Sequence, residues 1–371
     1  MIIGVPREIK NSEFRVGLTP GSVREYVSRG HRVLVETEAG IGIKVGDDDY
    51  RSAGAEIVGE AASVFASADM IVKVKEPQPE EWKQLREGQI LYTYLHLAPD
   101  PDQTRGLIDS GVTAIAYETV TDDEGGLPLL APMSEVAGRL AVQAAAYTLT
   151  AHRGGRGLLM GGVPGVMPAR VVIVGGGVVG THAAKMAAGL GADVTVLDVN
   201  LRRLGELDDM FLGRVKTRYS TFEALDEETD TADVVVGAVL IPGANAPKLV
   251  TREMLTGMKE GAVLVDVAID QGGCFETSKA TTHENPTYEV DGVLHYCVAN
   301  MPGAVPLTSS HALNNATLRY GLQLADHGLD ALRRNQHLRN GLNVHRGAVT
   351  YEAVAKAMNL DFVPALDAIS G

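Results

Sequence analysis

The feature that most constrains the fold is a glycine-rich turn between two apolar runs. Residues 171–198 read VVIVGGGVVGTHAAKMAAGLGADVTVLD, in which a strand pattern leads into the glycines, an alanine-rich helical segment follows, and a second strand pattern ends in Asp198. Glycines alone are a weak signal, but this order of strand, turn, helix and strand is typical of a dinucleotide-binding βαβ unit. The alternative is a glycine turn in an α/β sheet that binds no cofactor.

Each polar or small residue of this unit has its own physical reason. Gly175 allows the tight turn, Gly177 lets the backbone approach a pyrophosphate, and Gly180 lets the helix pack closely on the strand. The amino terminus of the helix attracts the phosphates. Asp198 can accept hydrogen bonds from the adenosine ribose and would repel a 2′-phosphate, so we predict NAD rather than NADP, although an Arg-Arg pair follows closely.

The length of the chain and its apolar pattern predict two domains. The 371 residues exceed one typical compact unit. Short apolar runs alternate with helix-like segments at the start of the chain, and six strand candidates in a βαβ rhythm follow a long helical pattern. A second long helical pattern leaves this part, and we infer that the C-terminal segment packs on the first domain. We therefore predict an α/β fold, with one domain formed by residues 1–130 plus 308–371 and a dinucleotide-binding domain formed by residues 131–307.

Composition excludes several classes of function. The formal net charge of -14 argues against non-specific binding to nucleic acid. The two cysteines, Cys274 and Cys297, are too few for a disulfide framework and are not spaced as metal ligands, so we predict reduced thiols and no metal. The start MIIGVPREIK has no export pattern, and no run approaches the roughly 20 apolar residues that cross a bilayer. We predict a cytoplasmic protein without a membrane partner.

Three basic or titratable residues stand near predicted strand ends in the first hundred residues. Lys75 closes DMIVKVK, His96 closes QILYTYLHL, and Arg15 lies in the loop after the first strand. Taken singly, each is more simply a surface charge or a packing residue. Together they form the composition of a site, with a fork for a carboxylate, a second cation and a group that titrates near neutrality.

The segment VLVDVAIDQGG, residues 263–273, predicts an apolar strand that carries Asp266 and Asp270 on one face. Asp266 is interpreted as a buried, hydrogen-bonded acid. Asp270 falls at the predicted carboxyl end of the strand, which is where open α/β sheets bind ligands. The simpler alternative is that Asp270 caps a turn with Gly272 and Gly273.

The motifs GVPREIKNSEFRVGLTP, KVKEP, YLHLAPD, GGGVVG, AIDQGG and VANMPGAVP together resemble those of the NAD-dependent alanine dehydrogenases, over essentially the whole chain. The resemblance implies two Rossmann-like domains and the reversible oxidative deamination of L-alanine to pyruvate and ammonium with NAD. It also implies a homo-oligomer, commonly a hexamer.

By the same resemblance, Arg15 binds the substrate carboxylate, and Lys75 holds the carboxylate or the developing carbonyl oxygen. His96 is the general acid or base, and Asp270 comes from the cofactor domain to meet His96 and assist the water and amine steps. The resemblance carries further cofactor contacts onto Ser134, Val178, Val179, Arg203, Ser220, Val239, Leu240, Val267, Ala268, Ile269, Asp270, Lys279, Val298, Ala299, Asn300 and Met301.

Three other functions compete with this interpretation. The nucleotide-binding component of proton-translocating transhydrogenase has a similar N-terminal pattern but needs no substrate acid and base, so the presence of both His96 and Asp270 favours the dehydrogenase. A saccharopine dehydrogenase would need room for a larger amino acid. A non-catalytic NAD-binding sensor would bind the cofactor without turnover.

Overall fold

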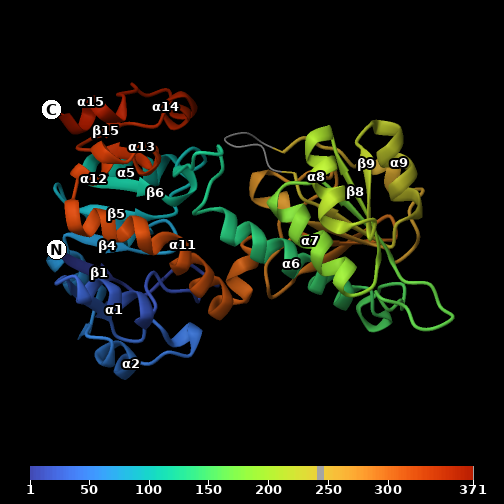
Figure 1. Ribbon diagram of the computed structural model, residues 1–371, viewed down its shortest axis with the longest axis horizontal. Helices are drawn as coiled ribbons and strands as arrows, with labels where there is room; N and C mark the ends of the chain where they lie inside the picture. Colours follow the sequence, from blue (N-terminus) through green and yellow to red (C-terminus); the bar gives the residue numbers. More distant parts are fainter. Residues whose placement is uncertain (240–245, 371) are drawn as a thin grey trace. The chain divides into compact units, whose positions relative to one another are not determined.

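The computed structural model describes residues 1–239 and 246–370, and it shows the predicted α/β fold (Figure 1). The chain divides into two compact units, which are described separately. Unit 1 comprises Met1–Met133 and Val305–Gly371, and unit 2 comprises Ser134–Ala304. The predicted cofactor contact Leu240 lies outside the described residues.

Unit 1 is built on one sheet. Its described strands are β1 (Ile2–Val5), β2 (Arg32–Glu36), β3 (Glu56–Val58), β4 (Met70–Val72), β5 (Ile90–Thr93), β6 (Thr113–Ala116), β14 (Leu342–His345) and β15 (Ala348–Val349). They form an eight-stranded sheet among the described residues, in the order β15-β14-β6-β5-β4-β1-β2-β3. Strands β1 to β6 are parallel, and β14 joins β6 in the antiparallel sense. The order of the parallel strands is that of a doubly wound nucleotide-binding fold, with its switch point between β1 and β4.

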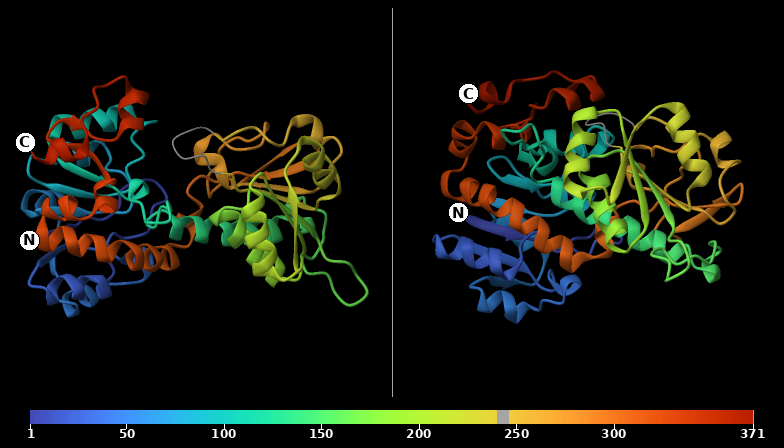
Figure 2. Two further views of the ribbon diagram at one scale, coloured as in Figure 1. Left: turned by 45° about the horizontal axis from the view of Figure 1, so that its top comes forward. Right: turned by 45° about the vertical axis from the view of Figure 1, so that its right-hand side comes forward.

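Helices cover both faces of this sheet (Figure 2). The unit's helices are α1 (Pro20–Ser28), α2 (Asp47–Ser52), α3 (Ala61–Ser67), α4 (Pro79–Trp82), α5 (Pro101–Ser110), α11 (Pro306–His327), α12 (Asp330–Arg334), α13 (Gln336–Arg339), α14 (Glu352–Met358) and α15 (Ala365–Ser370), with the 3-10 turns η1 (Ile41–Ile43) and η2 (Tyr117–Thr119). One apolar cluster joins the sheet to α1 and α11, and the other joins it to α3, α5 and α14. Because strand side chains alternate, strands such as β4, β5 and β6 contribute to both clusters.

Unit 2 repeats the same order of parallel strands. Its described strands are β7 (Arg170–Val174), β8 (Asp193–Asp198), β9 (Val215–Tyr219), β10 (Val234–Gly237), β11 (Val263–Asp266), β12 (Thr287–Val290) and β13 (Val293–Tyr296), in the sheet order β12-β13-β11-β10-β7-β8-β9. The six predicted strands correspond to the parallel ones. The antiparallel edge strand β12, which pairs with β13, was not predicted.

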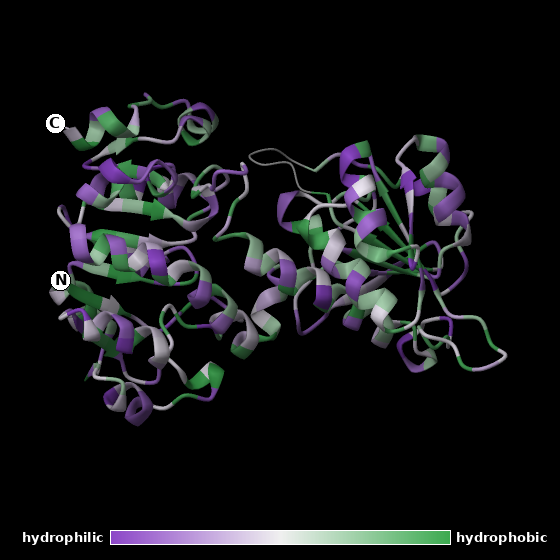
Figure 3. Cartoon of the chain, in the orientation of Figure 1, coloured by the Kyte–Doolittle hydropathy of each residue, from purple (hydrophilic) through white to green (hydrophobic). Residues whose placement is uncertain are grey.

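The helices of unit 2 again lie on both faces, and the strands form apolar bands between them (Figure 3). They are α7 (Val178–Gly189), α8 (Leu201–Phe211), α9 (Phe222–Thr231) and α10 (Arg252–Leu255), with η3 (Ala151–Arg153), η4 (Val267–Gln271) and η5 (Met301–Ala304). The long helix α6 (Ala131–Thr148) begins at the end of one stretch of unit 1 and continues in unit 2. None of the helices in the described part of the chain has the length and apolar character needed to span a membrane.

The prediction of a continuous strand up to Asp270 was wrong. Strand β11 ends at Asp266, and the chain turns into the 3-10 helix η4. The cause is local, because the Asp266 carboxylate accepts the backbone N–H of Ala268 at 3.0 Å and so draws the chain into a turn. Gly272, at a φ of 85°, ends this turn in the left-handed region.

Candidate active site

In unit 1, the predicted substrate residues follow strands on either side of the switch point. Arg15 lies in the loop after β1, and Lys75 and His96 lie three residues beyond the ends of β4 and β5. A Cβ at Gly17 would stand 2.3 Å from the carbonyl oxygen of Val72, so the loop after β1 passes directly over the end of β4. The carboxyl ends of parallel strands share one sheet edge, which brings the three loops together.

Arg15 is a buried guanidinium oriented by a neighbouring carboxylate. Its Nε and Nη2 donate to Oε1 and Oε2 of Glu13 at 2.7 and 2.5 Å, and its Nη1 lies 3.1 Å from the sulfur of Met133. Burial lowers the pKa of Arg15, but the hydrogen bonds and charge of Glu13 outweigh burial and raise that pKa above its ordinary value. Glu13 therefore orients the guanidinium of Arg15 and keeps it positively charged. The sequence analysis did not identify Glu13, although it stands two residues before Arg15.

Lys75 combines a fixed backbone with an available ammonium. Its carbonyl accepts the hydroxyl of Thr93 at 3.0 Å, which ties it to the end of β5. Among the described residues, no hydrogen bond or ion pair engages its Nζ. The adjacent carboxylate of Glu76 pairs with Lys10 instead. Burial raises the pKa of Glu76, but the charges of Lys75 and Lys10 outweigh burial and bring that pKa below its ordinary value.

His96 occupies a strained backbone position, and its side chain is 45% exposed. Its φ is 50°, in the left-handed region that disfavours a residue with a Cβ. Glu118 holds this conformation by accepting the N–H of Leu95 at 3.2 Å and that of His96 at 2.6 Å. The same carboxylate lies 3.8 Å from Nδ1 of His96, and the imidazole stacks on Tyr94 with ring centroids 5.8 Å apart. The site therefore orients an accessible imidazole.

A buried charge cluster surrounds Lys73, two residues before Lys75. The ammonium of Lys73 is 1% exposed and pairs with Glu8 at 3.1 Å and Glu81 at 2.8 Å. Burial raises the pKa of Glu8 to about 7, against the lowering effect of Lys73. The sequence analysis assigned these residues no role. The signal available was the lysine at position 73, which continues the apolar run of β4 and therefore needs buried partners.

In unit 2, the glycine turn has the geometry expected of it. Gly175 has a φ of 103°, and a Cβ there would stand 2.8 Å from the carbonyl oxygen of Ala238, beyond the end of β10. A Cβ at Gly180 would stand 1.8 Å from the carbonyl oxygen of Gly175. By contrast, a Cβ at Gly177 would meet no atom within 4 Å. The fold therefore requires glycine at positions 175 and 180, whereas Gly177 keeps open the space in front of the amino terminus of α7.

Asp198 and Arg203 both form hydrogen bonds with the backbone of the glycine turn. Oδ2 of Asp198 accepts the N–H of Gly176 at 2.6 Å, and Oδ1 accepts that of Asn200 at 2.8 Å. Nε of Arg203 donates to the carbonyl of Gly176 at 2.7 Å, and Nη2 donates to Thr181 at 2.6 Å. The turn is thus held from the end of β8 and from α8, by one acid and one base.

Most of the other predicted cofactor residues follow strands of the same sheet. Six parallel strands place their carboxyl ends on one edge. The residues at that edge are Val178 and Val179 after β7, Ser220 after β9, Val239 after β10, Val267, Ala268, Ile269 and Asp270 after β11, and Val298, Ala299, Asn300 and Met301 after β13.

The remaining two predicted contacts reach this edge from other segments. A Cβ at Gly138 of α6 would stand 2.2 Å from the carbonyl of Val179, and Ser134 lies one turn earlier on the same face of α6. Lys279 is exposed and precedes Thr281, whose N–H donates to the carbonyl of Cys297 at 2.9 Å, beyond β13.

Asp270 and Asp266 differ in environment, as their sequence positions suggested. Asp266 is fully buried, and its Oδ2 accepts the N–H of Cys274 at 2.9 Å and the hydroxyl of Ser278, which confirms its interpretation as a hydrogen-bonded core acid. Burial raises its pKa against these hydrogen bonds. Asp270 lies on η4 and is exposed, and no hydrogen bond to its carboxylate is seen among the described residues. Its carboxylate therefore does not cap the turn that Gly272 ends.

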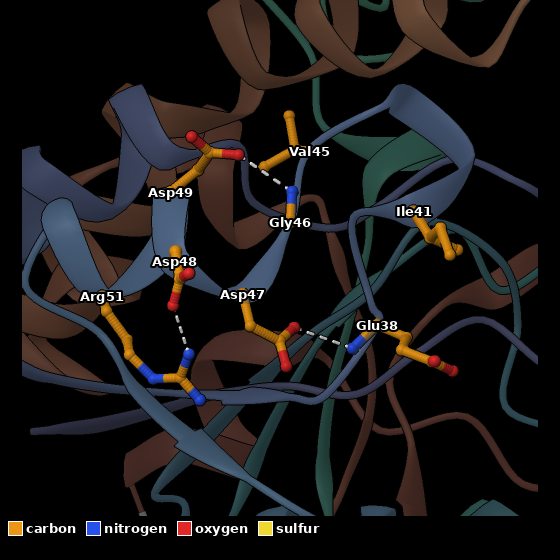
Figure 4. A pocket seen from close by; sticks show the side chains of 8 residues that line it. All are labelled: Glu38, Ile41, Val45, Gly46, Asp47, Asp48, Asp49 and Arg51. Carbon is orange, nitrogen blue, oxygen red and sulfur yellow. Dashed lines mark hydrogen bonds and ion pairs between the residues drawn. The ribbon is translucent and has the colours of Figure 1, made fainter.

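A separate pocket on unit 1 is acidic, but its carboxylates serve the local fold (Figure 4). It is lined by Glu38, Ile41, Val45, Gly46, Asp47, Asp48, Asp49 and Arg51. Asp47 accepts the hydroxyl of Thr37 at 2.6 Å, a hydrogen bond that lowers its pKa, and Asp48 pairs with Arg51 at 2.6 Å. In the described parts of the chain, no group of three or more His, Cys, Asp or Glu side chains is arranged to hold a metal ion.

Comparisons with known proteins cover nearly the whole chain. The family model described as alanine dehydrogenase/PNT, N-terminal domain, matches residues 4–137, and the C-terminal domain model matches residues 141–352. An alanine dehydrogenase of Halomonas elongata is 59% identical over 370 residues and 100% of both chains. A solved L-alanine dehydrogenase is similar at a TM-score of 0.94 and 53% identity, over 97% of this chain and 99% of that one. A solved transhydrogenase from Sinorhizobium meliloti is similar at a TM-score of 0.82 and 28% identity, over 95% and 100% of the two chains.

Proposed function

The chain belongs to the alanine dehydrogenase/PNT family, and we propose that it catalyses the NAD-dependent, reversible oxidative deamination of L-alanine to pyruvate and ammonium. The observation that carries this proposal is the grouping of Arg15, Lys75 and His96 on the loops at the switch point of unit 1. These side chains supply what an amino acid or keto acid requires, namely two cations for a carboxylate or carbonyl oxygen and one group that exchanges protons.

The residues of unit 1 divide the work by their chemistry. Arg15, whose guanidinium is oriented by Glu13, binds the substrate carboxylate. Lys75 places its ammonium beside the carboxylate or the developing carbonyl oxygen and stabilises negative charge there. His96 takes the proton that leaves when water attacks the iminium carbon, and it returns a proton when the amine departs.

The glycine turn of unit 2 fits a dinucleotide. The space in front of Gly177 is open to a pyrophosphate, and the amino terminus of α7 supplies N–H donors and a positive dipole end. When bound, the nicotinamide accepts the hydride from the substrate α-carbon. In this proposal, Asp198 at the end of β8 accepts hydrogen bonds from the ribose hydroxyls.

The arginines after Asp198 support NAD over NADP. Arg203 uses Nε and Nη2 on the glycine turn and α7, and its Nη1 on Glu206 at 2.7 Å. Arg202 is 90% exposed at its side chain and pairs with Glu206 at 3.2 Å. Neither guanidinium is directed by a buried partner toward a 2′-phosphate, whereas the Asp198 carboxylate would repel one.

We assign Asp270 to the same proton-transfer chemistry as His96. The Asp270 carboxylate is exposed and has no hydrogen-bond partner among the described residues, so it can accept protons from the water or the amine. A transhydrogenase, which passes hydride between two nicotinamides, needs neither of these groups, and the transhydrogenase comparison is also much more distant in identity than the alanine dehydrogenases. The oligomer we propose is a homohexamer, and the compartment we propose is the cytoplasm.

One experiment separates these functions. The purified protein is mixed with NAD and each of several L-amino acids while the absorbance of the reduced cofactor is followed. We expect turnover with L-alanine, little with NADP, and the reverse reaction with pyruvate and ammonium. Hydride exchange between two nicotinamides without any amino acid would support a transhydrogenase, and NAD binding without turnover would support a sensor. Light scattering on the same sample measures the oligomer, and a mass below a hexamer would overturn that part of the proposal.

A further inference from the structure

The buried carboxylate of Glu8 touches the segment that carries Lys75. Glu8 lies in the loop after β1, and its Oε1 accepts the N–H of Val74 at 2.7 Å. Its Oε2 accepts the ammonium of Lys73 at 3.1 Å and the N–H of Lys75 at 3.4 Å. One carboxylate therefore joins the loop of Arg15 to the segment of Lys75.

From this arrangement we propose that Glu8 is a positioning residue, which sets the backbone of residues 74–75 so that the Lys75 ammonium meets the substrate. The inference rests on the function proposed above for Lys75. Glu8 does not touch the substrate in this assignment. It acts through the two amide N–H groups, while Thr93 holds the carbonyl of Lys75 from the other side at 3.0 Å.

Charge balance alone does not explain where Glu8 stands. A buried ammonium needs a counter-charge, and Glu81 already provides one to Lys73 at 2.8 Å. Glu81 also accepts the N–H of Gln78 at 2.7 Å, which serves the start of α4, and it has no hydrogen bond to Val74 or Lys75 among those seen in the described residues. The two acids share the same cation, but only Glu8 reaches the Lys75 segment.

The surroundings of Glu8 give this contact a dependence on pH. The charged groups around it are Lys73 at the end of β4, Glu81 on α4, and Glu13 and Arg15 in its own loop, with the phenol of Tyr117 from η2 nearby. Burial raises the pKa of Glu8 to about 7, with Glu81 and Glu13 acting in the same direction and Lys73 opposing them. A carboxylate accepts hydrogen bonds from two amides and an ammonium more strongly than a carboxylic acid does. The hydrogen bonds between Glu8 and the segment of Lys75 are therefore strongest above neutral pH.

The pair Glu8→Gln and Glu81→Gln tests the proposal, because both remove one negative charge from Lys73. In Glu8→Gln, the amide nitrogen replaces an acceptor that faces two donors, so the N–H of Lys75 loses its partner. In Glu81→Gln, the amide oxygen still accepts the N–H of Gln78, as glutamine does in a capping box. We expect Glu8→Gln to raise KM for L-alanine and for pyruvate about tenfold with kcat within about threefold of the parent, and Glu81→Gln to leave KM within about twofold. Equal changes in KM for both variants would overturn the positioning role.

Hydrogen exchange measured by mass spectrometry gives a readout that does not depend on turnover. We expect peptides that cover residues 73–76 to exchange faster in Glu8→Gln than in Glu81→Gln, with the Kd for NAD unchanged in both. Unchanged exchange in Glu8→Gln would overturn the inference even if the protein is an active alanine dehydrogenase. Faster exchange in a protein that does not oxidise alanine would instead contradict the proposed function. Should Glu8→Gln not fold, Glu8→Asp keeps the charge on Lys73 but is one methylene shorter, and the same KM and exchange results are expected of it.

Discussion

The two units share one strand order but differ in what they place at the switch point. In unit 1, the loops after β1 and β4 carry charged side chains, including the buried pairs Arg15–Glu13 and Lys73–Glu8. In unit 2, the loops after β7 and β10 meet through a glycine whose Cβ would collide with the carbonyl of Ala238. At its switch point, unit 1 thus presents charged side chains, whereas unit 2 presents backbone groups.

Under the proposed function, this difference lets one topology bind two kinds of ligand. A small carboxylic acid must be oriented by directed charges, which have to be held by partners because they are partly desolvated. A pyrophosphate is large and doubly charged, and a helix amino terminus with an uncovered backbone can bind it. The sheet fixes where ligands bind, and the loops decide which ligands those are.

The largest expected effect tests the side-chain half of the comparison. His96→Ala or Asp270→Asn should lower kcat about 10²- to 10⁴-fold, because each removes a group assigned to proton transfer. Stopped-flow or steady-state rates with L-alanine and NAD measure this loss. NAD should still bind to both variants, as a fluorescence titration measures, because neither change touches the glycine turn.

The double variant sharpens this prediction. If His96 and Asp270 act in one step, the double variant should be little slower than the slower single variant. Losses that multiply would mean that the two residues act independently. Near-normal turnover of Asp270→Asn would remove it from the mechanism and leave it as a residue of the turn.

The next effect tests the backbone half of the comparison with two glycines. Gly180→Ala should lower the free energy of unfolding by about 3 kcal/mol, because its Cβ would stand 1.8 Å from the carbonyl of Gly175. Gly177→Ala should unfold at nearly the same urea concentration as the parent, because its Cβ meets open space. It should nevertheless weaken NAD binding at least about tenfold if a pyrophosphate approaches there. Unchanged NAD affinity in Gly177→Ala would contradict the proposed phosphate position.

The sequence predicted the strand–turn–helix–strand unit around the glycines of unit 2, but it did not predict where β11 ends. Strand β7, helix α7 and strand β8 were confirmed because their apolar periods and glycines are local signals. The strand predicted to reach Asp270 was wrong, since the side chain of Asp266 competes with the sheet for the N–H of Ala268. Alternation of apolar residues carries no information about such a bond.

The supporting carboxylates of unit 1 illustrate what pattern cannot predict. Glu118 holds the loop of His96 from 22 positions further along the chain, and Glu8 reaches Val74 across 66 positions. Strand ends indicate which side chains face a ligand, but the partners that orient those side chains depend on which loops become neighbours. These partners can be found only once the strand order is known.

A smaller effect concerns stability and isolates Glu8. The raised pKa of Glu8, about 7 against 4.5, means that the folded protein binds its proton more tightly than the unfolded chain. The resulting contribution of Glu8 to the free energy of unfolding is fully present below the pKa of the unfolded chain, and it is lost as pH rises through about 7. Between about pH 8 and about pH 5.5, the free energy of unfolding of the parent should therefore rise by about 2 kcal/mol relative to Glu8→Gln. Urea titrations at both pH values measure the difference, and a constant difference would show that Glu8 does not titrate in this range.

The smallest effects compare the residues that follow β8. Asp198→Ala should weaken NAD binding about tenfold, because the ribose hydroxyls lose a charged acceptor. Asp198 also accepts the N–H of Gly176 at 2.6 Å, so part of this loss comes from a looser glycine turn. The control is Arg202→Ala, whose side chain is 90% exposed and pairs only with Glu206 among the described residues. An exposed pair contributes at most about 1 kcal/mol, so this variant should bind NAD as the parent does and should not change the low activity with NADP. A parent with strong NADP turnover that Arg202→Ala abolishes would show that the arginine, and not Asp198, selects the cofactor.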